Sequence, residues 1–332
     1  MKKSPNIKRI LSGYSDYMSF LTSKSILITG GAGFIGSNLA QALISKGFRV
    51  VILDDLSTGL ESNVSRGAHF IFGSILDSKL VNELVRDAGV VFHLAARGSV
   101  PRSIDQPNET FEVNFKGTLN LLEAVKENKI PLIFSSSSSV YGANKSIPKS
   151  EFDWVSPLSP YAASKLAAEG AITAYASSYG IQATIFRFFN VYGRLQRFDH
   201  PYAAVIPKWI HQAENKNALT VYGDGNQSRD FTHVTTVTKI LIQTINDSIF
   251  SQIPINLAFG KSSSLNDILQ ILRLHYPDLV VNYQLSRPGE VTHSSNLPTR
   301  LNSLFSEVNE IPISDGIRDT IAWYRQLNSR IS

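Results

Sequence analysis

The sequence predicts an α/β fold with a doubly wound parallel sheet, on the basis of three observations. Short runs rich in Val, Ile and Leu alternate with longer segments of helical period through the first half of the 332 residues. These runs are apolar throughout, which is typical of strands covered by helices on both faces. After about residue 190 the alternation gives way to segments that contain Pro, Gly and Asn. We therefore expect a smaller, irregular α/β lobe in the C-terminal part.

The individual elements follow from the same periodicity. We expect strands at Ser25–Thr29, Arg49–Leu53, His69–Phe72, Val90–Leu94, Leu132–Ser136 and Gln182–Arg187. We expect helices at about 34–46, 78–87, 108–128 and 160–178. The chain then has three expected parts: a basic extension over residues 1–23, a sheet domain over 24–189 with later segments interleaved, and a second lobe over 190–332.

The composition excludes several classes of function. Cysteine is absent and the seven His residues show no metal-ligand spacing, so we expect neither disulfides nor a metal site. Residues 1–24 carry four of the five net positive charges, so the remainder is nearly neutral and nucleic acid is not an expected partner. No apolar run reaches the roughly 18 residues of a membrane span, and no signal-peptide pattern is present. We expect a cytoplasmic protein whose basic leader is a short, partly helical extension or, alternatively, a membrane- or partner-binding tail.

The first expected strand runs into a glycine turn and then a helix, in the stretch SILITGGAGFIG. Gly30, Gly33 and Gly36 allow a tight turn and a close approach of the backbone to a pyrophosphate, and they start a helix whose N-terminal amides face that anion. Asp54 ends the second strand eighteen residues later, where a carboxylate can accept both ribose hydroxyls and repel a 2′-phosphate. The pattern predicts a Rossmann-like dinucleotide site that prefers NAD to NADP. Asp55 is either a further contact or a surface-turn residue.

A run of five serines follows the fifth expected strand, in FSSSSSVYG (134–142). A serine run by itself is typical of a flexible linker. This run directly continues an apolar strand, and ligands of doubly wound sheets bind beyond the carboxyl ends of the strands. We therefore interpret these serines as part of a functional site.

Tyr161 and Lys165 form a Tyr-x-x-x-Lys pair near the start of the last expected helix. Residues four apart share one helix face, and an ammonium beside a phenol favours the phenolate and lowers the phenol's pKa toward neutrality. Such a pair can transfer protons. Ser159-Pro160 precedes it as the expected N-cap and first-turn proline. The chain has a second pair, Tyr141 and Lys145, which encloses Gly and Asn and is interpreted as a turn.

Seven motifs occur in one order along the chain: TGGAGFIG (29–36), LDD (53–55), HLAA (93–96), VNFKGT (113–118), SSSSVYG (136–142), YAASK (161–165) and RFFNVYG (187–193). In this set and order the chain resembles the extended short-chain dehydrogenase/reductases, in the branch of nucleotide-sugar epimerases and dehydratases, from about residue 24 onward. The resemblance implies a Rossmann-like doubly wound sheet with a smaller substrate lobe. It also implies bound NAD and a homodimer formed by the helices around 108–128 and 160–178.

The resemblance assigns the cofactor contacts. It implies that Asn114 lies near the nicotinamide and that Phe188 packs on its ring, whereas a helix-interior Asn and a core Phe are the alternatives. Ser74 is a departure, because the family usually has an aspartate there that meets the adenine. The cofactor-binding residues implied are Gly30, Gly33, Phe34, Ile35, Gly36, Asp54, Asp55, Leu56, Ser57, Thr58, Gly59, Ser74, Ile75, Leu94, Ala95, Ala96, Arg97, Asn114, Tyr161, Lys165 and Phe188.

The resemblance also assigns the catalytic residues. It implies Ser137 as the catalytic serine, Tyr161 as the acid/base and Lys165 as its electrostatic partner on the nicotinamide ribose. Related dehydratases carry an Asp-Glu pair where this chain has Ser138 and Ser139, and related decarboxylases carry a Glu at the second position. Ser139 is implied to bond the reacting hydroxyl of the sugar. Without those carboxyl groups, the expected reaction is C4 epimerisation through a 4-keto sugar.

Segments of the second lobe resemble the family's UDP-binding segments, in which Arg229 and Arg287 suit a diphosphate through forked donors. The narrowest resemblance, carried by ARGSVPRS (96–103), AAVIPKW (203–209) and HSS (293–295), is to bacterial UDP-N-acetylglucosamine 4-epimerases. The small Ser294 leaves room for an N-acetyl group. The substrate-binding residues implied are Ser99, Val100, Arg102, Ser137, Ser138, Ser139, Tyr161, Asn190, Gln196, Ala204, Val205, Lys208, Trp209, Tyr222, Arg229, Arg287, Glu290 and Ser294.

Other reactions stay open on the sequence alone. A UDP-glucose 4-epimerase and a UDP-(N-acetyl)glucuronate 4-epimerase differ from the favoured enzyme only in what surrounds C2 and C6 of the sugar. A nucleotide-sugar dehydratase and a non-catalytic NAD-binding protein are more remote alternatives. They stay open because fold does not dictate function. The non-catalytic alternative is disfavoured because the Ser, Tyr and Lys set is intact.

Overall fold

The computed structural model describes residues 23–199, 203–286 and 292–329, and the chain divides into two compact units. The first comprises the segment up to Ser136, Ser159–Ile185 and Ile240–Ile253, and the second comprises Ser137–Leu158, Phe186–Lys239 and the segment from Pro254 onward. The basic leader, residues 1–22, lies outside the described residues.

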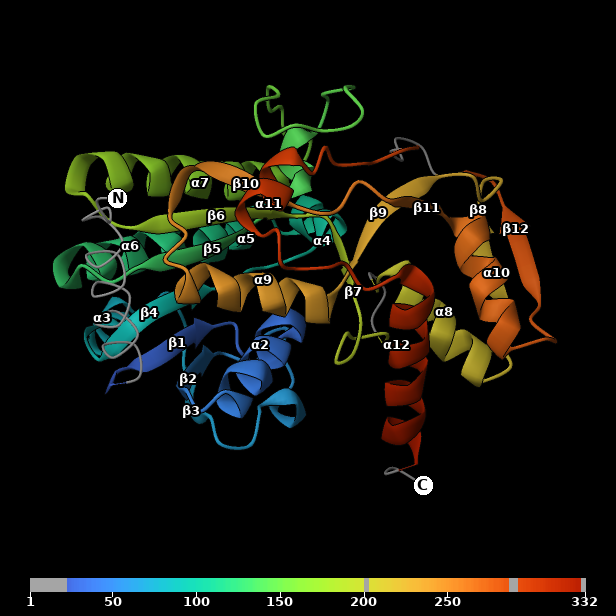
Figure 1. Cartoon of the computed structure of the whole chain (residues 1–332), viewed down its shortest axis with the longest axis horizontal. Coiled ribbons are helices and arrows are strands. Elements are labelled where there is room, and N and C mark those ends of the chain that lie inside the picture. Colours follow the sequence, from blue (N-terminus) through green and yellow to red (C-terminus); the bar gives the residue numbers. More distant parts are fainter. Residues whose placement is uncertain (1–22, 200–202, 287–291, 330–332) are drawn as a thin grey trace, which may run out of the picture. The chain divides into compact units, whose positions relative to one another are not determined.

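The first unit is built on a seven-stranded sheet with the order β10-β6-β5-β4-β1-β2-β3 (Figure 1). Its strands are β1 (Ser25–Thr29), β2 (Arg49–Asp54), β3 (His69–Phe72), β4 (Ala88–His93), β5 (Leu132–Ser137), β6 (Ala183–Phe188) and β10 (Ser251–Leu257). The pairs β1–β2, β1–β4, β2–β3 and β4–β5 are parallel. The strand order reverses direction between β1 and β4, so the doubly wound α/β fold is confirmed.

The six strands expected from the sequence are all present, within two residues at each end. Their apolar runs fill the centre of the sheet, where Ile28 of β1 pairs with Ile52 on one side and with Phe92 on the other. All three side chains are fully buried. Strands β5, β6 and β10 and helix α9 (Val234–Asn246) each continue from one unit into the other, which periodicity along the chain does not reveal.

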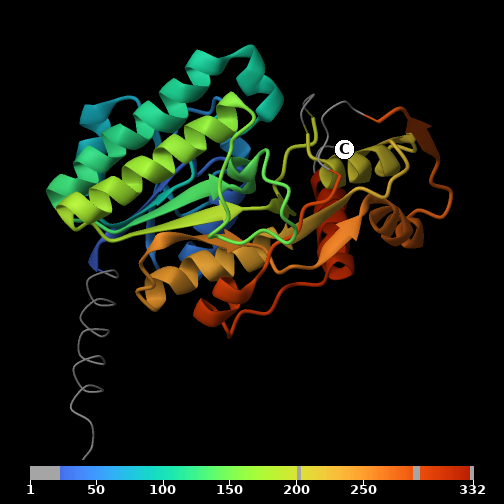
Figure 2. The same ribbon diagram turned by 90° about the horizontal axis from the view of Figure 1, so that it is seen from above.

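The helices of the first unit are α2 (Phe34–Ser45), α3 (Ser78–Arg86), α4 (Val100–Asp105), α5 (Pro107–Phe111), α6 (Gly117–Asn128) and α7 (Pro160–Tyr179). Figure 2 shows α3, α6 and α7 side by side over one face of the sheet. Ser159 caps α7 by accepting a hydrogen bond from the amide of Ala162, as its position before Pro160 predicts. The expected helix at 108–128 is instead three pieces, because a π-helical turn at Glu112–Lys116 separates α5 from α6.

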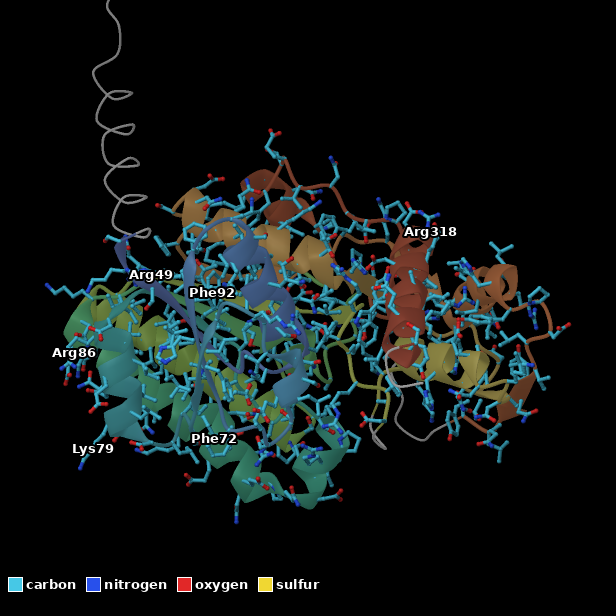
Figure 3. The ribbon with its side chains drawn as sticks, turned by 90° about the horizontal axis from the view of Figure 1, so that it is seen from below. Arg49, Phe72, Lys79, Arg86, Phe92 and Arg318 are labelled. Atoms are coloured by element: carbon cyan, nitrogen blue, oxygen red, sulfur yellow. The ribbon has the colours of Figure 1, made fainter. Side chains whose placement is uncertain are left out.

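Helix α3 shows how an amphipathic sequence positions these helices. Asp77 caps it by accepting from the amides of Lys79 and Leu80. Val81 and Val85 face the sheet and are fully buried, whereas Lys79 and Arg86 point outward (Figure 3). One apolar stripe therefore holds the helix against the strands.

The core of the first unit lies between the sheet and this helix layer. It joins strand residues to helix residues in one cluster, which includes Leu27, Leu53, Val91, Phe134, Ile185, Val81, Val85, Leu121, Leu122, Val125 and Ile172. Burial of a side chain of this kind stabilises the fold by roughly 1.5–3 kcal/mol. The cluster thus fixes the strand ends on which the polar residues described below are mounted.

The second unit is smaller and less regular, as expected. It has a three-stranded sheet, β11 (Ser262–Ser264), β9 (Ser228–His233) and β7 (Asn190–Tyr192), and a parallel pair, β12 (Val281–Gln284) and β8 (Leu219–Tyr222). Its other helices are α8 (Val205–Glu214), α10 (Leu265–His275), α11 (Thr299–Leu304) and α12 (Ile313–Asn328). Among the described residues of the whole chain, every helix is too short or too polar to cross a bilayer.

Candidate active site

The glycine turn after β1 has the geometry that its sequence predicts. Gly30 has φ +74°, and a Cβ there would lie 2.6 Å from the amide nitrogen of Ala95. A Cβ on Gly36 would lie 2.3 Å from the carbonyl oxygen of Gly30, so the start of α2 packs directly on the turn. Gly33 is the N-cap of α2 and supplies no side-chain cap. The first-turn amides and the positive end of the helix dipole are therefore available to an anion.

An open cleft of about 480 Å³ adjoins this turn, beyond the carboxyl ends of the strands. It is lined by Gly30, Gly33, Leu53, Asp54, Asp55, Ser57, Thr58, Gly73, Ile75, Leu94, Ala95, Ala96 and Val113. Most of these are among the predicted cofactor residues. Leu53, Gly73 and Val113 were not predicted, although the first two directly precede predicted residues at strand ends. A cleft of this shape, with glycines at one side and a carboxylate at another, fits a dinucleotide.

Asp54 lies at the end of β2 and is largely buried. Its Oδ2 accepts a 2.9 Å hydrogen bond from the amide of Ala32 in the glycine turn, and its Oδ1 accepts a 2.9 Å bond from the amide of Leu56. Burial raises the pKa of this carboxyl, and the two amides oppose that change. Asp54 therefore ties the turn to the loop after β2 while each oxygen keeps a lone pair for a hydroxyl donor.

The other predicted cofactor residues next to Asp54 have local roles. Asp55 accepts a 3.0 Å hydrogen bond from the amide of Ser57, which forms a surface turn of the kind that the alternative interpretation described. The hydroxyl of Ser74 accepts a 3.3 Å bond from the amide of Leu76 and so closes the turn after β3. Of the remaining predicted cofactor residues of this unit, Phe34 and Ile35 form the first turn of α2, and Gly59 is buried against Ala32.

Asn114 lies in the π-helical turn and is almost completely buried. Its Oδ1 accepts a 2.7 Å hydrogen bond from the amide of Arg97, and its Nδ2 donates a 2.9 Å bond to Oγ of Ser164 on α7. Turns of this kind recur at functional sites, where they redirect a side chain. Asn114 thus fastens the loop after β4 to the helix that carries Tyr161 and Lys165.

His93 at the end of β4 is a buried polar residue for which no role was predicted. Its Nδ1 lies 2.7 Å from Oγ1 of Thr29, and its Nε2 lies 3.0 Å from Oγ1 of Thr118. The hydroxyl of Thr118 donates to the carbonyl of Asn114, so Nε2 of His93 carries the proton and donates to Thr118. Burial, aided by the charge of Lys165, lowers the pKa of His93 to about 3, and the ring is neutral. The sequence feature that could have indicated a role for His93 is its position at a strand end, within the motif HLAA.

Lys165 is 2% exposed, and its Nζ donates a 2.8 Å hydrogen bond to the carbonyl of Ser135. Nζ also lies 4.8 Å from the ring centre of Phe134. Burial lowers the pKa of this ammonium to about 7, and the charge of Glu169 opposes that change. Tyr161 lies one turn earlier on the same face of α7 and is half-buried. The predicted pair is therefore built into one helix.

The serine run is ordered structure and not a linker. Ser137 ends β5, and its Oγ accepts from the amide of Ser139 at 3.2 Å and from the hydroxyl of Ser139 at 2.9 Å. This arrangement leaves the hydroxyl hydrogen of Ser137 available to a further acceptor. Ser138 begins the short 3₁₀ helix Ser138–Tyr141, of which Ser137 is the N-cap.

The second Tyr/Lys pair is a turn, as interpreted. The hydroxyl of Tyr141 donates a 2.7 Å hydrogen bond to Oδ1 of Asn256 and accepts a 3.0 Å bond from Nη1 of Arg187. Burial raises the pKa of this phenol, which keeps it protonated. Lys145 is exposed in the loop that follows.

The predicted sugar-nucleotide residues are distributed over both units. Ser99, Val100 and Arg102 lie at the start of α4 in the first unit, where Ser99 caps the helix by accepting from the amide of Arg102. In the second unit, Trp209 is a core residue whose indole donates to the carbonyl of Thr220.

Most other predicted residues of the second unit make backbone contacts. Asn190 donates to the carbonyl of Asp230, Gln196 to that of Val191, and Arg229 to those of Ser228 and Thr292, while the amide of Ser294 donates to Ser228. Ala204 is the N-cap of α8, Val205 and Lys208 lie in its first turns, Tyr222 ends β8, and Phe188 ends β6. Arg287 and Glu290 lie outside the described residues.

Within the described ranges, no group of His, Asp and Glu side chains could hold a metal ion.

Comparisons with known proteins agree with this geometry. The sequence profile of the NAD dependent epimerase/dehydratase family matches residues 26–258. A putative UDP-glucose 4-epimerase of Methanocaldococcus jannaschii is 34% identical over 91% of this chain and 99% of its own length. A UDP-N-acetyl-alpha-D-glucosaminuronate decarboxylase of Bacillus cytotoxicus is 33% identical over 92% of this chain and 99% of its own. The solved structure of a UDP-N-acetylglucosamine 4-epimerase from Methanobrevibacter ruminantium M1, in complex with UDP-N-acetylmuramic acid, has 36% identity and a TM-score of 0.87 over 92% of this chain and 99% of its own.

Proposed function

Because the chain belongs to the NAD dependent epimerase/dehydratase family, we propose that it is a UDP-hexose 4-epimerase that interconverts UDP-N-acetylglucosamine and UDP-N-acetylgalactosamine. The observation that carries the choice of reaction is the row of hydroxyls at Ser137, Ser138 and Ser139, which holds no carboxyl group. Expulsion of a hydroxyl group needs a positioned acid. Besides the hydride acceptor that NAD would provide, epimerisation needs only a group that takes a proton from the C4 hydroxyl and returns it.

The residues of this chain supply that proton transfer. Tyr161 is proposed to take the C4 hydroxyl proton, and the Lys165 ammonium lowers the cost of the resulting phenolate. Ser137, whose hydroxyl hydrogen is not used by Ser139, is proposed to donate to the C4 oxygen in both its alcohol and its ketone form. NAD, held by the glycine turn and Asp54, would supply the hydride-transfer chemistry at C4, and the residues of this chain would hold the sugar and move the proton.

Three features of the glycine turn and its cleft support the binding of NAD. Without Cβ atoms, Gly30 packs closely on the backbone of Ala95 and Gly36 packs on the Gly30 carbonyl, so the turn is tight, and the uncapped α2 begins directly at this turn with its first amides available to an anion. Asp54 would accept the ribose hydroxyls with its free lone pairs.

The N-acetyl group is the finer part of the proposal. The small Ser294 supports it, as does the 36% identity to a 4-epimerase whose solved complex holds UDP-N-acetylmuramic acid. UDP-glucose and the UDP-uronates are the alternative substrates. A decarboxylase is the second candidate, favoured by the Bacillus cytotoxicus relative but opposed by the serine at position 139. We also propose a homodimer, formed by the helices around 108–128 and 160–178, and a cytoplasmic location.

Purified protein incubated with each UDP-sugar, followed by chromatographic separation of the products, tests the proposal. We expect UDP-N-acetylglucosamine to reach equilibrium with its C4 epimer without net formation of NADH. Carbon dioxide release from a UDP-uronate would favour the decarboxylase instead. If no UDP-hexose is inverted at C4, the proposed function is wrong.

A further inference from the structure

Glu169 is a buried carboxylate in the first unit that the proposed mechanism does not use. It lies on α7 and is 4% exposed, beside Ala168 and within one turn of Ile172, which belong to the hydrophobic core. A carboxylate at such a position costs free energy unless other groups compensate its charge. The groups around it therefore indicate what it does.

Two neighbouring residues of β5 hold Glu169 and Lys165 by different means. Ser136, which is itself buried, donates a hydrogen bond from Oγ to Oε1 of Glu169. The preceding residue, Ser135, accepts the hydrogen bond from Nζ of Lys165 through its backbone carbonyl. The end of one strand thus fixes both a negative and a positive side chain of the same helix.

The two charges lie four residues apart on α7, so they face the same side of the helix. Burial disfavours the charged form of Lys165, and the charge of Glu169 favours it. The titratable groups around Lys165 in this unit are Tyr161 and Glu169 on the same helix and His93 on β4. Because burial keeps His93 neutral, Glu169 provides the compensating negative charge.

We propose that Glu169, anchored by Ser136, is a positioning residue that holds the Lys165 ammonium in place and keeps it charged. The inference rests on the proposed function, in which that ammonium stabilises the Tyr161 phenolate. Glu169 acts only through Lys165 and touches neither the sugar nor the reacting atoms in this scheme. Its removal should change the pH range of the reaction and not only its rate.

The substitution Glu169→Gln removes the charge, keeps the volume, and still offers an oxygen to Ser136. Activity requires a charged Lys165, so the rate falls as pH rises through the pKa of that ammonium. We expect the alkaline limb of the kcat profile to move to lower pH by about one unit in Glu169→Gln. At pH values above that limb, the rate of Glu169→Gln should be about tenfold lower than the rate of the parent protein. Glu169→Asp keeps the charge and should restore much of the parental limb. Glu83→Gln, at an exposed position on α3, is the matched control.

A direct titration makes the test independent of catalysis. The Lys165 side-chain resonance is followed by NMR in the full chain, without sugar, and is assigned with Lys165→Arg. We expect it to titrate at lower pH in Glu169→Gln than in the parent protein. Ser136→Ala keeps both charges and should shift the resonance in the same direction by less, which provides a second measurement if Glu169→Gln does not fold.

The outcomes separate this inference from the proposed function. The inference is overturned if Glu169→Gln leaves both the Lys165 titration and the alkaline limb of the kcat profile unchanged. If Glu169→Gln does not fold, an unchanged Lys165 titration in Ser136→Ala overturns it instead. A uniform loss of rate at every pH would overturn it as well, because a merely structural role predicts that result. The proposed function is tested separately by Tyr161→Phe. If that variant inverts C4 at the parental rate, the proposed function fails, and this result does not depend on the role of Glu169.

Discussion

Nδ2 of Asn114 donates a 2.9 Å hydrogen bond to Oγ of Ser164, so a π-helical turn and helix α7 are joined by one buried amide. The same side chain accepts from the amide of Arg97. One buried side chain therefore bonds two parts of the candidate site, the loop after β4 and the helix of the Tyr/Lys pair.

Replacement of Asn114 by alanine should destabilise the protein. The substitution leaves the Arg97 amide and the Ser164 hydroxyl without this partner, and we expect the free energy of unfolding to fall by about 2–4 kcal/mol. Urea unfolding measures the change. Asn108→Ala, at an exposed position on α5, is the control and should have little effect. Equal stability of both variants would contradict the role given to Asn114.

Replacement of Gly36 by alanine should weaken both the fold and cofactor binding. The new Cβ would lie 2.3 Å from the Gly30 carbonyl oxygen, and overpacking of this kind costs about 1–3 kcal/mol. We expect a lower midpoint in urea and less NAD released per chain on denaturation. Gly170→Ala on α7 is the control, because a Cβ there meets nothing within 4 Å. That control should gain about 0.5–1 kcal/mol from helix propensity. A Gly36→Ala protein with parental stability and NAD content would show that this close approach is unimportant.

The sequence predicted those parts of the structure that local chemistry determines. The strands were found because their apolar runs are continuous, the Gly30 turn because only glycine suits its backbone, and the start of α7 because Ser159 caps it. The π-helical turn was missed, since apolar period does not distinguish it from a continuous helix. The roles of His93 and Glu169 were missed because their partners lie on other elements that are distant in the sequence, and only tertiary packing shows that these polar side chains are buried and bonded.

Replacement of Tyr161 by phenylalanine removes the proposed proton-transfer group. We expect kcat for C4 inversion to fall by about 10²–10⁴-fold, because that is the usual contribution of a positioned acid/base. The stability and the NAD content should change little, since the ring is retained. Tyr179→Phe is the control on the same helix, at an exposed position, and should keep parental activity. Inversion by Tyr161→Phe at the parental rate would refute the proposed mechanism.

His93 makes a testable contribution to stability against acid. Its pKa is lowered by burial to about 3 in the folded protein, whereas an unfolded histidine titrates at about 6.5. Between these values the unfolded chain binds one more proton than the folded chain does, so the stability that His93 contributes is complete above about pH 6.5 and is lost as pH falls toward 3.

The substitution His93→Gln isolates this effect. Glutamine can still bond Thr29 and Thr118 but does not titrate. Carboxylates elsewhere also titrate in acid, so the measured quantity is the difference in slope between the parent and the variant. From pH 6 to pH 4 the parent should lose about 1.4 kcal/mol per pH unit more than His93→Gln, as one extra proton requires. Urea unfolding at several pH values measures both slopes. His69→Gln, at an exposed position on β3, should follow the parent, and parallel slopes for the parent and His93→Gln would mean that His93 is not held neutral.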